Sequence, residues 1–447
     1  MDCCRREATW LVLAALVVRL GVLAVTLAAP HAVALRDYAG ARAGPGPACA
    51  TTSERIARRP QCAVLAEDEI GYDALGRNIA AGRGYRLDQG WLYAQPNTPT
   101  AYGGFLYPAF VGGVYAATHD NALVLFLLQS LIGALAVAGV AYAAFRLADR
   151  PAALAAGTLA ALHPGLALNS AWVMSEALAV PLLLGAYLLW VRYLELPTLA
   201  RAGAFGVAAA AACLTRSPAL YALGLMMALS LPRRGFAWKL HARNGVAALA
   251  LFAACVAPWA ARNARVFHAF VPFDTKAGAG LWLNNHPGAR PWREVWRGAP
   301  DPQPPPEPIT GLNEAEADRQ FRVMTTAYVR DQPFTFAGIS AFRLALALVP
   351  VPRWWGRWPL VRAVAAALYV ALTWLALAGL WRVRRNAEGR ALIGIAGGWL
   401  LLMAFTAVGL RHRLPAEWAF TVAAGLALSV AWARLRRRAS APPPPPR

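Results

Sequence analysis

The stretch NALVLFLLQSLIGALAVAGVAYAAF (121–145) decides the fold class, because no charged residue interrupts it. A helix needs roughly 20 mostly apolar residues to cross the hydrocarbon core of a bilayer. Similar stretches recur along the chain. We therefore predict an all-α polytopic membrane protein with about ten transmembrane helices, at about 8–29, 121–145, 151–169, 172–191, 202–215, 217–231, 245–261, 359–381, 390–410 and 415–433.

The composition also favours a membrane protein. Of the 447 residues, 58% are hydrophobic and only 15% are charged, whereas soluble domains are nearer half apolar and a quarter charged. This balance argues against a soluble enzyme, a disordered protein and a disulfide-stapled secreted module. The net charge of +21 favours anionic lipid or a phosphorylated ligand as partner. In a membrane protein nucleic acid is the weakest of the partners that such a charge suggests, so we expect none.

The basic residues predict the orientation. Clusters of Arg and Lys near 5–6, 146–150, 233–243, 382–385 and 434–438 all fall on one side of the membrane when ten spans are drawn. Cytoplasmic loops carry such an excess of basic residues, so both termini are expected inside. Two long loops, 30–120 and 262–358, then lie outside and carry short helices. We expect one transmembrane body (1–433) and a basic, Pro-rich cytoplasmic tail (434–447).

Several features leave two interpretations open. The first apolar run follows Arg5 and Arg6 and ends near small residues, as in a signal peptide, but its length favours a retained span. Arg19 inside this run indicates either a structural ion pair or a wet cavity. Cys49 and Cys62 share an outer loop and form either a disulfide or two free thiols.

The second outer loop has three distinct parts. APDPQPPPEPIT (299–310) is typical of a stiff, extended linker. The pattern at 313–331 predicts an amphipathic helix with Phe321, Met324, Ala327 and Tyr328 on one face. The apolar residues 334–350 are interrupted by Arg343 and are expected to lie at the membrane interface.

The first outer loop contains an acidic motif, EDEIGYDALGRNIAAGRGY (67–85). Glu67, Asp68 and Glu69 open a helical pattern, and acids at a helix start cap free N–H groups and oppose the macrodipole. A carboxylate held at the membrane surface is also suited to act as a general base on a hydroxyl. Both interpretations stay open and are compatible, because a helix start fixes the position of a carboxylate.

Cations recur on the same outer side, where the orientation rule should deplete them. Each alone is typical of a surface cation that extends toward water. As a set they predict a phosphate site, formed by Arg216, Arg262, Lys276, Arg411 and Arg413. No nucleotide-binding motif occurs, so an energised donor is expected to be something other than a cytoplasmic nucleotide. The seven His residues show no metal-ligand spacing, so no metal is inferred.

An ordered series of motifs resembles a known family. The series consists of 67–85, FLYPAFVGGVYAATHDNALVLFLLQSLIGAL (105–135), ALHPGLALNSAWVMSEAL (161–178), LTRSP (214–218), PWAARN (258–263) with FVPFDTKAGAGLWLNN (270–285), and RHRLPAEW (411–418). It is similar to the GT-C superfamily of membrane glycosyltransferases, which use polyprenyl-phosphate sugars. The nearest branch contains protein O-mannosyltransferases and bacterial lipid A aminoarabinose transferases. The resemblance covers roughly residues 8–433.

The resemblance implies roles for particular residues. The acid of the first outer loop is the catalytic base in the family, and the best match here is Asp68, with Glu69 as its supporting neighbour. Outer basic residues bind the carrier phosphate, which implicates the five cations named above. Further candidates lie inside the matching motifs: Tyr72, Tyr107, Glu176 and Asn263.

The resemblance further implies a hexosyl or pentosyl transfer that inverts the anomeric carbon. The donor is a polyprenyl-phosphate-linked sugar, and the acceptor is a glycan, lipid or protein. The reaction takes place at the periplasmic face of the bacterial cytoplasmic (inner) membrane. A divalent metal stays open, because some family members need one.

Two other functions remain as alternatives. A transporter or flippase of lipid-linked sugars would show broken helices in related halves. A non-catalytic membrane subunit would explain the spans, but not an acidic motif and cations on one side.

Overall fold

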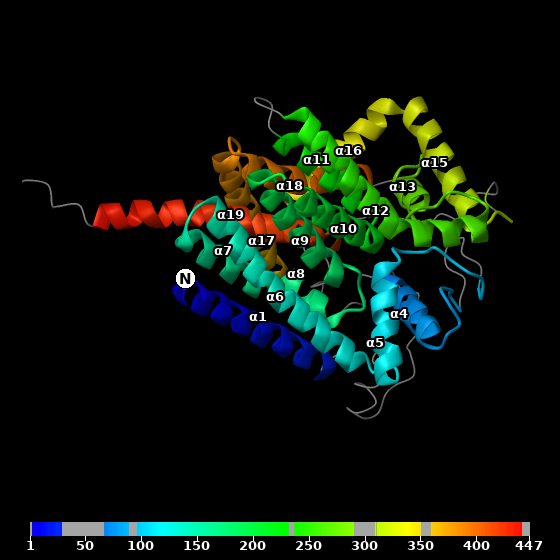
Figure 1. The fold of residues 1–447 in the computed structure, drawn as a ribbon, viewed down its shortest axis with the longest axis horizontal. Coiled ribbons are helices and arrows are strands. Elements are labelled where there is room, and N and C mark those ends of the chain that lie inside the picture. Colours follow the sequence, from blue (N-terminus) through cyan, green and yellow to red (C-terminus); the bar gives the residue numbers. More distant parts are fainter. Residues whose placement is uncertain are drawn as a thin grey trace, which may run out of the picture.

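The structure is a computed structural model that describes residues 2–28, 67–88, 96–231, 237–289, 309, 311–349 and 359–439. Every regular element in these ranges is a helix (Figure 1), so the all-α prediction is confirmed. The helices are α1 (Asp2–Ala28), α4 (Glu67–Ala80), α5 (Leu106–Thr118), α6 (Ala122–Leu147), α7 (Arg150–Leu162), α8 (Pro164–Leu168), the short 3₁₀ helix η2 (Asn169–Ala171), α9 (Glu176–Glu195), α10 (Leu199–Thr215), α11 (Ala219–Ser230), α12 (Trp238–Phe267), α13 (Ala277–Asn284), α15 (Glu314–Asp331), α16 (Pro333–Leu348), α17 (Pro359–Val383), α18 (Ala387–Phe405) and α19 (Leu410–Ala439).

Seven of the described helices are long and apolar enough to cross a membrane, and the bent pair of α7 with α8 and η2 would make an eighth. The predicted number of ten is therefore not confirmed. Each predicted span has a helix, but α10 has 17 residues and α11 has 12. At a rise of 1.5 Å per residue both are shorter than a bilayer core of about 30 Å. The chain is a multi-pass membrane protein.

A break in the bundle places the first residue of α9. The pair of α7 with α8 bends by 54° at His163, which is followed by Pro164. A proline ends the preceding helix because it lacks an N–H and its ring clashes with the turn before it. The His163 ring caps the new helix, since its Nδ1 accepts a hydrogen bond from the Leu166 N–H. The chain then turns through η2, and α9 begins at Glu176.

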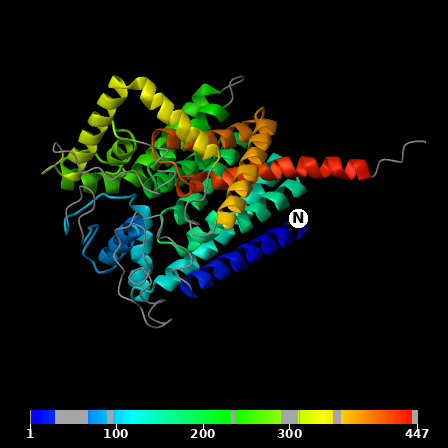
Figure 2. The ribbon, with the colours of Figure 1, turned by 180° about the vertical axis from the view of Figure 1, so that it is seen from behind.

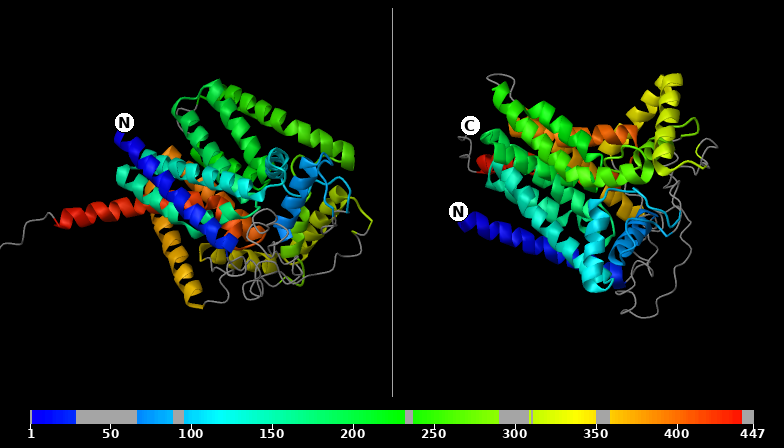
Figure 3. Two further views of the ribbon diagram at one scale, coloured as in Figure 1. Left: turned by 90° about the horizontal axis from the view of Figure 1, so that it is seen from below. Right: turned by 45° about the vertical axis from the view of Figure 1, so that its right-hand side comes forward.

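The elements separate into two ends of the molecule. The start of α1 and the last turns of α19 lie at one end, and α4, α5, α13 and α15 gather at the other (Figures 1 and 2). Two further views show the same separation (Figure 3). Ion pairs join neighbouring helices at the first end, between Arg150 and Glu7 and between Arg146 and Glu388.

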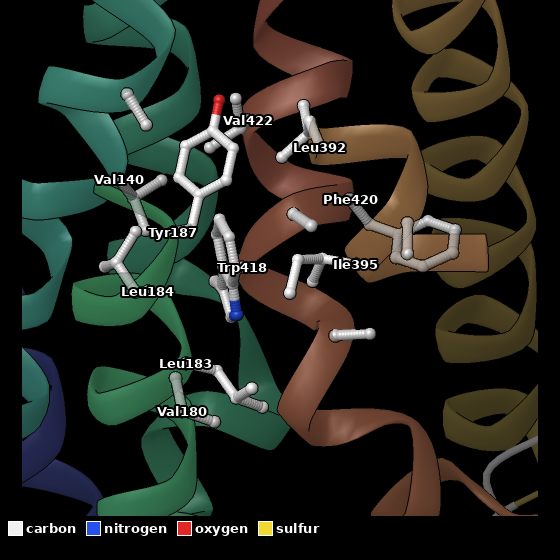
Figure 4. Packing of buried hydrophobic residues seen from close by; sticks show 14 of the residues in the cluster. Val140, Val180, Leu183, Leu184, Tyr187, Leu392, Ile395, Trp418, Phe420 and Val422 are labelled. Carbon is white, nitrogen blue, oxygen red and sulfur yellow. The ribbon is translucent and has the colours of Figure 1, made fainter. Parts of the chain in front are cut away.

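The core is built around α19, the most buried of the candidate spans. Trp418 is fully buried and lies 5.4 Å from Tyr187, measured between ring centroids (Figure 4). Backbones approach closely where residues are small, as is usual between membrane helices. A Cβ on Gly379 of α17 would lie 1.8 Å from the Ala423 carbonyl oxygen of α19. This packing fixes the start of α19, which carries Arg411 and Arg413.

The predicted helix at 313–331 is confirmed as α15. Asn313 and Glu316 form a capping box at its start. Phe321 and Tyr328 are buried as expected, whereas Ala327 is exposed. The predicted interfacial segment is α16, whose Arg343 is fully buried and donates to the Asn284 carbonyl and the Asn285 side chain. Cys49, Cys62 and nearly all of the 299–310 segment lie outside the described residues.

Candidate active site

Asp68 is the second residue of α4, and three side chains from distant segments meet its carboxylate. The Lys276 ammonium lies 2.6 Å from one oxygen, and a terminal nitrogen of Arg411 lies 2.5 Å from the other. The Tyr102 hydroxyl donates to the first oxygen at 2.7 Å and accepts from Lys276 at 3.0 Å. The carboxylate of the acidic motif is thus held by ion pairs and not by helix capping alone.

A second carboxylate joins this group. Glu176 is fully buried at the start of α9. Its side chain lies 2.6 Å from the Arg216 guanidinium and 3.0 Å from Nε of Arg411. Arg411 therefore bridges Glu176 and Asp68. Three cations and two carboxylates leave one uncompensated positive charge in this cluster of Asp68, Glu176, Arg216, Lys276 and Arg411, which we call the carboxylate–cation cluster.

Electrostatics keep Asp68 ionised. Burial alone would raise the pKa of its carboxyl group, because desolvation penalises the charged form. The charges of Lys276 and Arg411, together with hydrogen bonds from Lys276 and Tyr102, outweigh that effect and hold the pKa well below its usual range. The group is therefore an ionised carboxylate at any pH near neutrality.

Tyr72 and Tyr107, two of the predicted candidates, brace the segment before α9. Tyr72 donates to the Ser175 hydroxyl at 3.3 Å, and Arg216 donates to the same hydroxyl at 3.2 Å. The rings of Tyr72 and Tyr107 meet edge to face at 5.2 Å. Tyr107 donates to Gln129 at 2.8 Å. Tyr72 thus supports Ser175, the neighbour of Glu176, whereas Tyr107 acts through Gln129, whose amide donates to the Trp172 carbonyl.

Glu69 points to a different part of the structure from Asp68. It is buried, and one of its oxygens accepts a hydrogen bond from the Val173 N–H at 2.9 Å. Because Val173 precedes α9, this bond ties the start of α4 to the start of α9. Glu69 thus holds together the two elements that carry Asp68 and Glu176.

Arg262 and Arg413, two of the predicted cations, and Asn263, a predicted amide, make their contacts outside the carboxylate–cation cluster. Arg262 donates to the Thr100 carbonyl at 2.7 Å and to the Asn263 side chain at 2.9 Å, and it lies over the Trp259 ring. Asn263 donates to the Val271 carbonyl at 2.9 Å. These contacts fasten the C-terminal end of α12 to the segment between α4 and α5.

Arg413 is fully buried and pairs with Glu417 at 2.6 Å within α19. It also donates to the Thr373 hydroxyl and to the Ala347 carbonyl, so that it links α19 to α16 and α17. Neither Arg262 nor Arg413 belongs to the carboxylate–cation cluster.

Sequence reasoning missed Tyr102 as a partner of Asp68. It lies in a turn between α4 and α5, where no charge and no periodic pattern marks it. The two glycines that follow Tyr102 are the sequence feature that indicates a tight turn here. In the structure Gly103 adopts a positive φ of 68°. A Cβ on Gly104 would meet the Leu214 and Thr215 carbonyls at 2.4 Å. This close approach brings the turn against the end of α10, next to Arg216.

Arg19 resolves one of the open alternatives. Among the described residues it pairs with no carboxylate; one of its nitrogens donates to the Ala15 carbonyl of its own helix, and Nε has no partner there. The side chain lines a small cavity together with Gln129, Asn169 and Glu176. Of the two interpretations, the structure thus supports the one in which Arg19 lines a cavity.

The described residues contain no group of three His, Cys, Asp or Glu side chains that could hold a metal ion. Asp68 and Glu176 are each bonded to two cations, so these two carboxylates do not form an open ligand set.

Comparison with known proteins identifies the fold. The sequence matches no protein-family profile and no curated protein. Among solved structures, the apo form of the oligosaccharyltransferase from Archaeoglobus fulgidus superposes with a TM-score of 0.53 at 16% identity, over 94% of this chain. The complex of archaeal AglB, an oligosaccharyltransferase from Archaeoglobus fulgidus, with an inhibitory peptide and a dolichol-phosphate gives a TM-score of 0.50 at 17% identity over 95% of this chain.

The chain has the GT-C fold.

The GT-C fold of this chain spans about half the length of AglB, since the matches cover 51–52% of that protein. ArnT from Cupriavidus metallidurans bound to undecaprenyl phosphate also matches, over 79% of this chain and 73% of ArnT at 13% identity. Its TM-score of 0.37 is too low to carry an argument. The GT-C fold that the sequence motifs implied is confirmed by the likeness to AglB.

Proposed function

We propose that this protein transfers a sugar from a polyprenyl-phosphate carrier to an acceptor at the periplasmic face of the bacterial cytoplasmic membrane. The observation that carries the proposal is the bridge of Arg411 between Asp68 and Glu176, with Arg216 and Lys276 beside it. A carboxylate can act as the general base, and an excess of positive charge can stabilise an anionic leaving group. The cluster holds both in one place.

The fold likeness supports the choice of donor. AglB has been solved with dolichol-phosphate and with an inhibitory peptide, so a protein of this fold binds a lipid phosphate and a peptide. We assign the carrier phosphate of this chain to Arg216, Lys276 and Arg411, because the cluster holds one more cation than carboxylates. We assign structural roles to Arg262 and Arg413, because both donate hydrogen bonds to backbone carbonyls and Arg413 also pairs with Glu417.

The reaction follows from these assignments. An acceptor oxygen attacks the anomeric carbon from the face opposite the phosphate, and the bond between that carbon and the phosphate oxygen breaks. The carrier leaves as a phosphate, whose growing negative charge the cations stabilise. The acceptor proton passes to the Asp68 carboxylate. Attack from the opposite face inverts the anomeric configuration.

Donor binding has a second consequence. In the structure the ammonium of Lys276 is ion-paired with the Asp68 carboxylate. The incoming phosphate therefore competes with Asp68 for that cation. Displacement frees the carboxylate to face the acceptor. The low pKa of Asp68 makes it a weak base, so its proton arrives late, when the acceptor oxygen is already bonding to the sugar.

The function is tested in a deletion strain that carries the wild-type protein, Asp68→Asn or the control Asp331→Asn. Asp331 is an exposed carboxylate at the end of α15. Intact-mass comparison of envelope lipids, glycans and proteins should show one sugar-bearing species with the wild type and the control, and its loss with Asp68→Asn. Retention of that species in Asp68→Asn would contradict the assigned base, and its presence in the deletion strain would contradict the function.

A further inference from the structure

Glu314 is a buried carboxylate that joins two segments of the outer region. It is the first residue of α15, and only 4% of it is exposed. One of its oxygens accepts from the Ala101 N–H at 3.0 Å and from the Thr275 hydroxyl at 2.9 Å. The same two segments also bond directly, since the Thr275 N–H donates to the Ala101 carbonyl at 3.3 Å.

The residues that follow in each segment are partners of Asp68. Tyr102 follows Ala101, and Lys276 follows Thr275. Their side chains meet each other at 3.0 Å and both bind Asp68. Glu314 therefore fixes the backbone one residue before each of the two groups that hold the carboxylate.

We propose that Glu314 is a positioning residue, which sets Lys276 and Tyr102 on Asp68 by holding their two backbone segments together. The inference deepens the proposed function and rests on it, because it specifies how the site's cation and hydroxyl are placed. It adds to the site a residue that belongs to the second outer loop.

Helix capping and helix docking do not account for Glu314. Asn313 caps α15, with Glu316 as its partner in the capping box. α15 packs against α13 through the apolar contact of Phe321 and Ala317 with Ala279, and the Asp318 carboxylate accepts a hydrogen bond from the Gly278 N–H, so this docking does not use Glu314. Burying a carboxylate costs free energy unless it is hydrogen-bonded, and its second oxygen has no partner among the described residues. The hydrogen bonds from Ala101 and Thr275 therefore remain as the contacts that account for the buried Glu314 carboxylate.

Amine labelling tests this placement directly. The chain contains only two lysines, Lys239 and Lys276, and Lys239 is exposed at the opposite end of the protein, at the start of α12. An ammonium held in an ion pair reacts more slowly with an acylating reagent than a free one. Brief treatment of the purified full chain with acetic anhydride, followed by peptide mass spectrometry, measures acetylation of Lys276 relative to Lys239.

Four variants separate the explanations. Glu314→Ala should raise the ratio of labelling at Lys276 to that at Lys239 several-fold, as should Asp68→Asn, which removes the ion-pair partner. Thr275→Val removes the donor at the other end of the bond and should raise the ratio as well, even if Glu314→Ala folds poorly. Phe321→Leu weakens the docking of α15 alone and should leave the ratio at the wild-type value.

An unchanged ratio in Glu314→Ala and Thr275→Val, with a raised ratio in Asp68→Asn, overturns the positioning role while the proposed site stands. Equal rises in Phe321→Leu and Glu314→Ala also overturn it, because docking of α15 would then suffice. An unchanged ratio in Asp68→Asn shows that the pair of Asp68 and Lys276 does not form, and both proposals fall.

A double-mutant cycle gives a second readout. Undecaprenyl phosphate binding, measured by quenching of tryptophan fluorescence, should weaken in Glu314→Ala and in Lys276→Ala. The double variant should bind no worse than Lys276→Ala, because a residue that acts through another has nothing further to remove. Additive losses would overturn the proposal, and no loss in Lys276→Ala would contradict the phosphate site itself.

Discussion

The ammonium of Lys276 lies 2.6 Å from the carboxylate of Asp68, although the two residues are 208 positions apart in the sequence. One residue opens α4 in the first outer loop, and the other precedes α13 in the second. The pair shows that two segments far apart in the sequence meet at Asp68. Under the proposed function, the carrier phosphate would compete with Asp68 for the ammonium of Lys276.

Asp68→Asn should separate binding from chemistry. Loss of the base should cut transfer by at least about 100-fold, the low end of the range for general base catalysis. Loss of the competing charge should instead tighten the binding of undecaprenyl phosphate several-fold. Transfer by the purified protein and quenching of tryptophan fluorescence measure the two effects, with Asp331→Asn as control. Weaker phosphate binding in Asp68→Asn would show that the carboxylate supports the cations and does not compete.

Arg216→Gln and Arg262→Gln form a matched pair of cation removals. Arg216→Gln should cost about 1.5–3 kcal/mol in binding of undecaprenyl phosphate, the range for a hydrogen bond to a charged group. Arg262→Gln should leave binding unchanged and lower the melting temperature, because Arg262 holds backbone carbonyls of the first outer loop. Equal losses of binding in both variants would return Arg262 to the phosphate site.

The stability contributed by the Asp68 ion pairs should persist to acid pH. The folded-state pKa of Asp68 lies well below its usual range, and the unfolded value is about 3.9. A depressed acid pKa gives stability that is present above the unfolded pKa and is lost as pH falls through the folded one. The difference in melting temperature between the wild type and Asp68→Asn should stay constant from pH 8 to about pH 5 and shrink only below it.

The stability contributed by Glu314 should change with pH in the direction opposite to that contributed by Asp68. Burial raises the pKa of Glu314 above its ordinary value, against opposing hydrogen bonds that include those from Ala101 and Thr275. The folded state then holds a proton that the unfolded state has lost, so stability falls as pH rises through the raised pKa. The melting temperature of Glu314→Gln relative to the wild type should rise over that window. A flat difference would show that Glu314 has no raised pKa.

The orientation can be tested with reporters. A phosphatase that is active only in the periplasm should be silent when fused after Arg438 and active when inserted after Arg290. The charge pattern of the loops predicts this result. The chain ends also agree with it, since the start of α1 and the last turns of α19 share one end of the molecule (Figure 2). Activity after Arg438 would reverse the orientation.

Much of the fold could be predicted because its determinants are local. Apolar runs, basic clusters and capping residues act within a few positions of one another, and they located α6, α4 and α15 closely. The number of spans was predicted less well, because α10 and α11 are short and divided at Arg216. A hydropathy pattern does not show whether a short helix crosses the membrane by itself.

By itself, the sequence determined a membrane bundle, an acidic helix start at Asp68 and cations near the ends of several helices. Only the tertiary structure decided which of these cations meet Asp68. Lys276 and Arg411 do so, whereas Arg413, two residues beyond Arg411, turns into the core to pair with Glu417. Residues two apart on a helix point in different directions, so the packing of α19 against its neighbours assigned one arginine to the site and the other to the core.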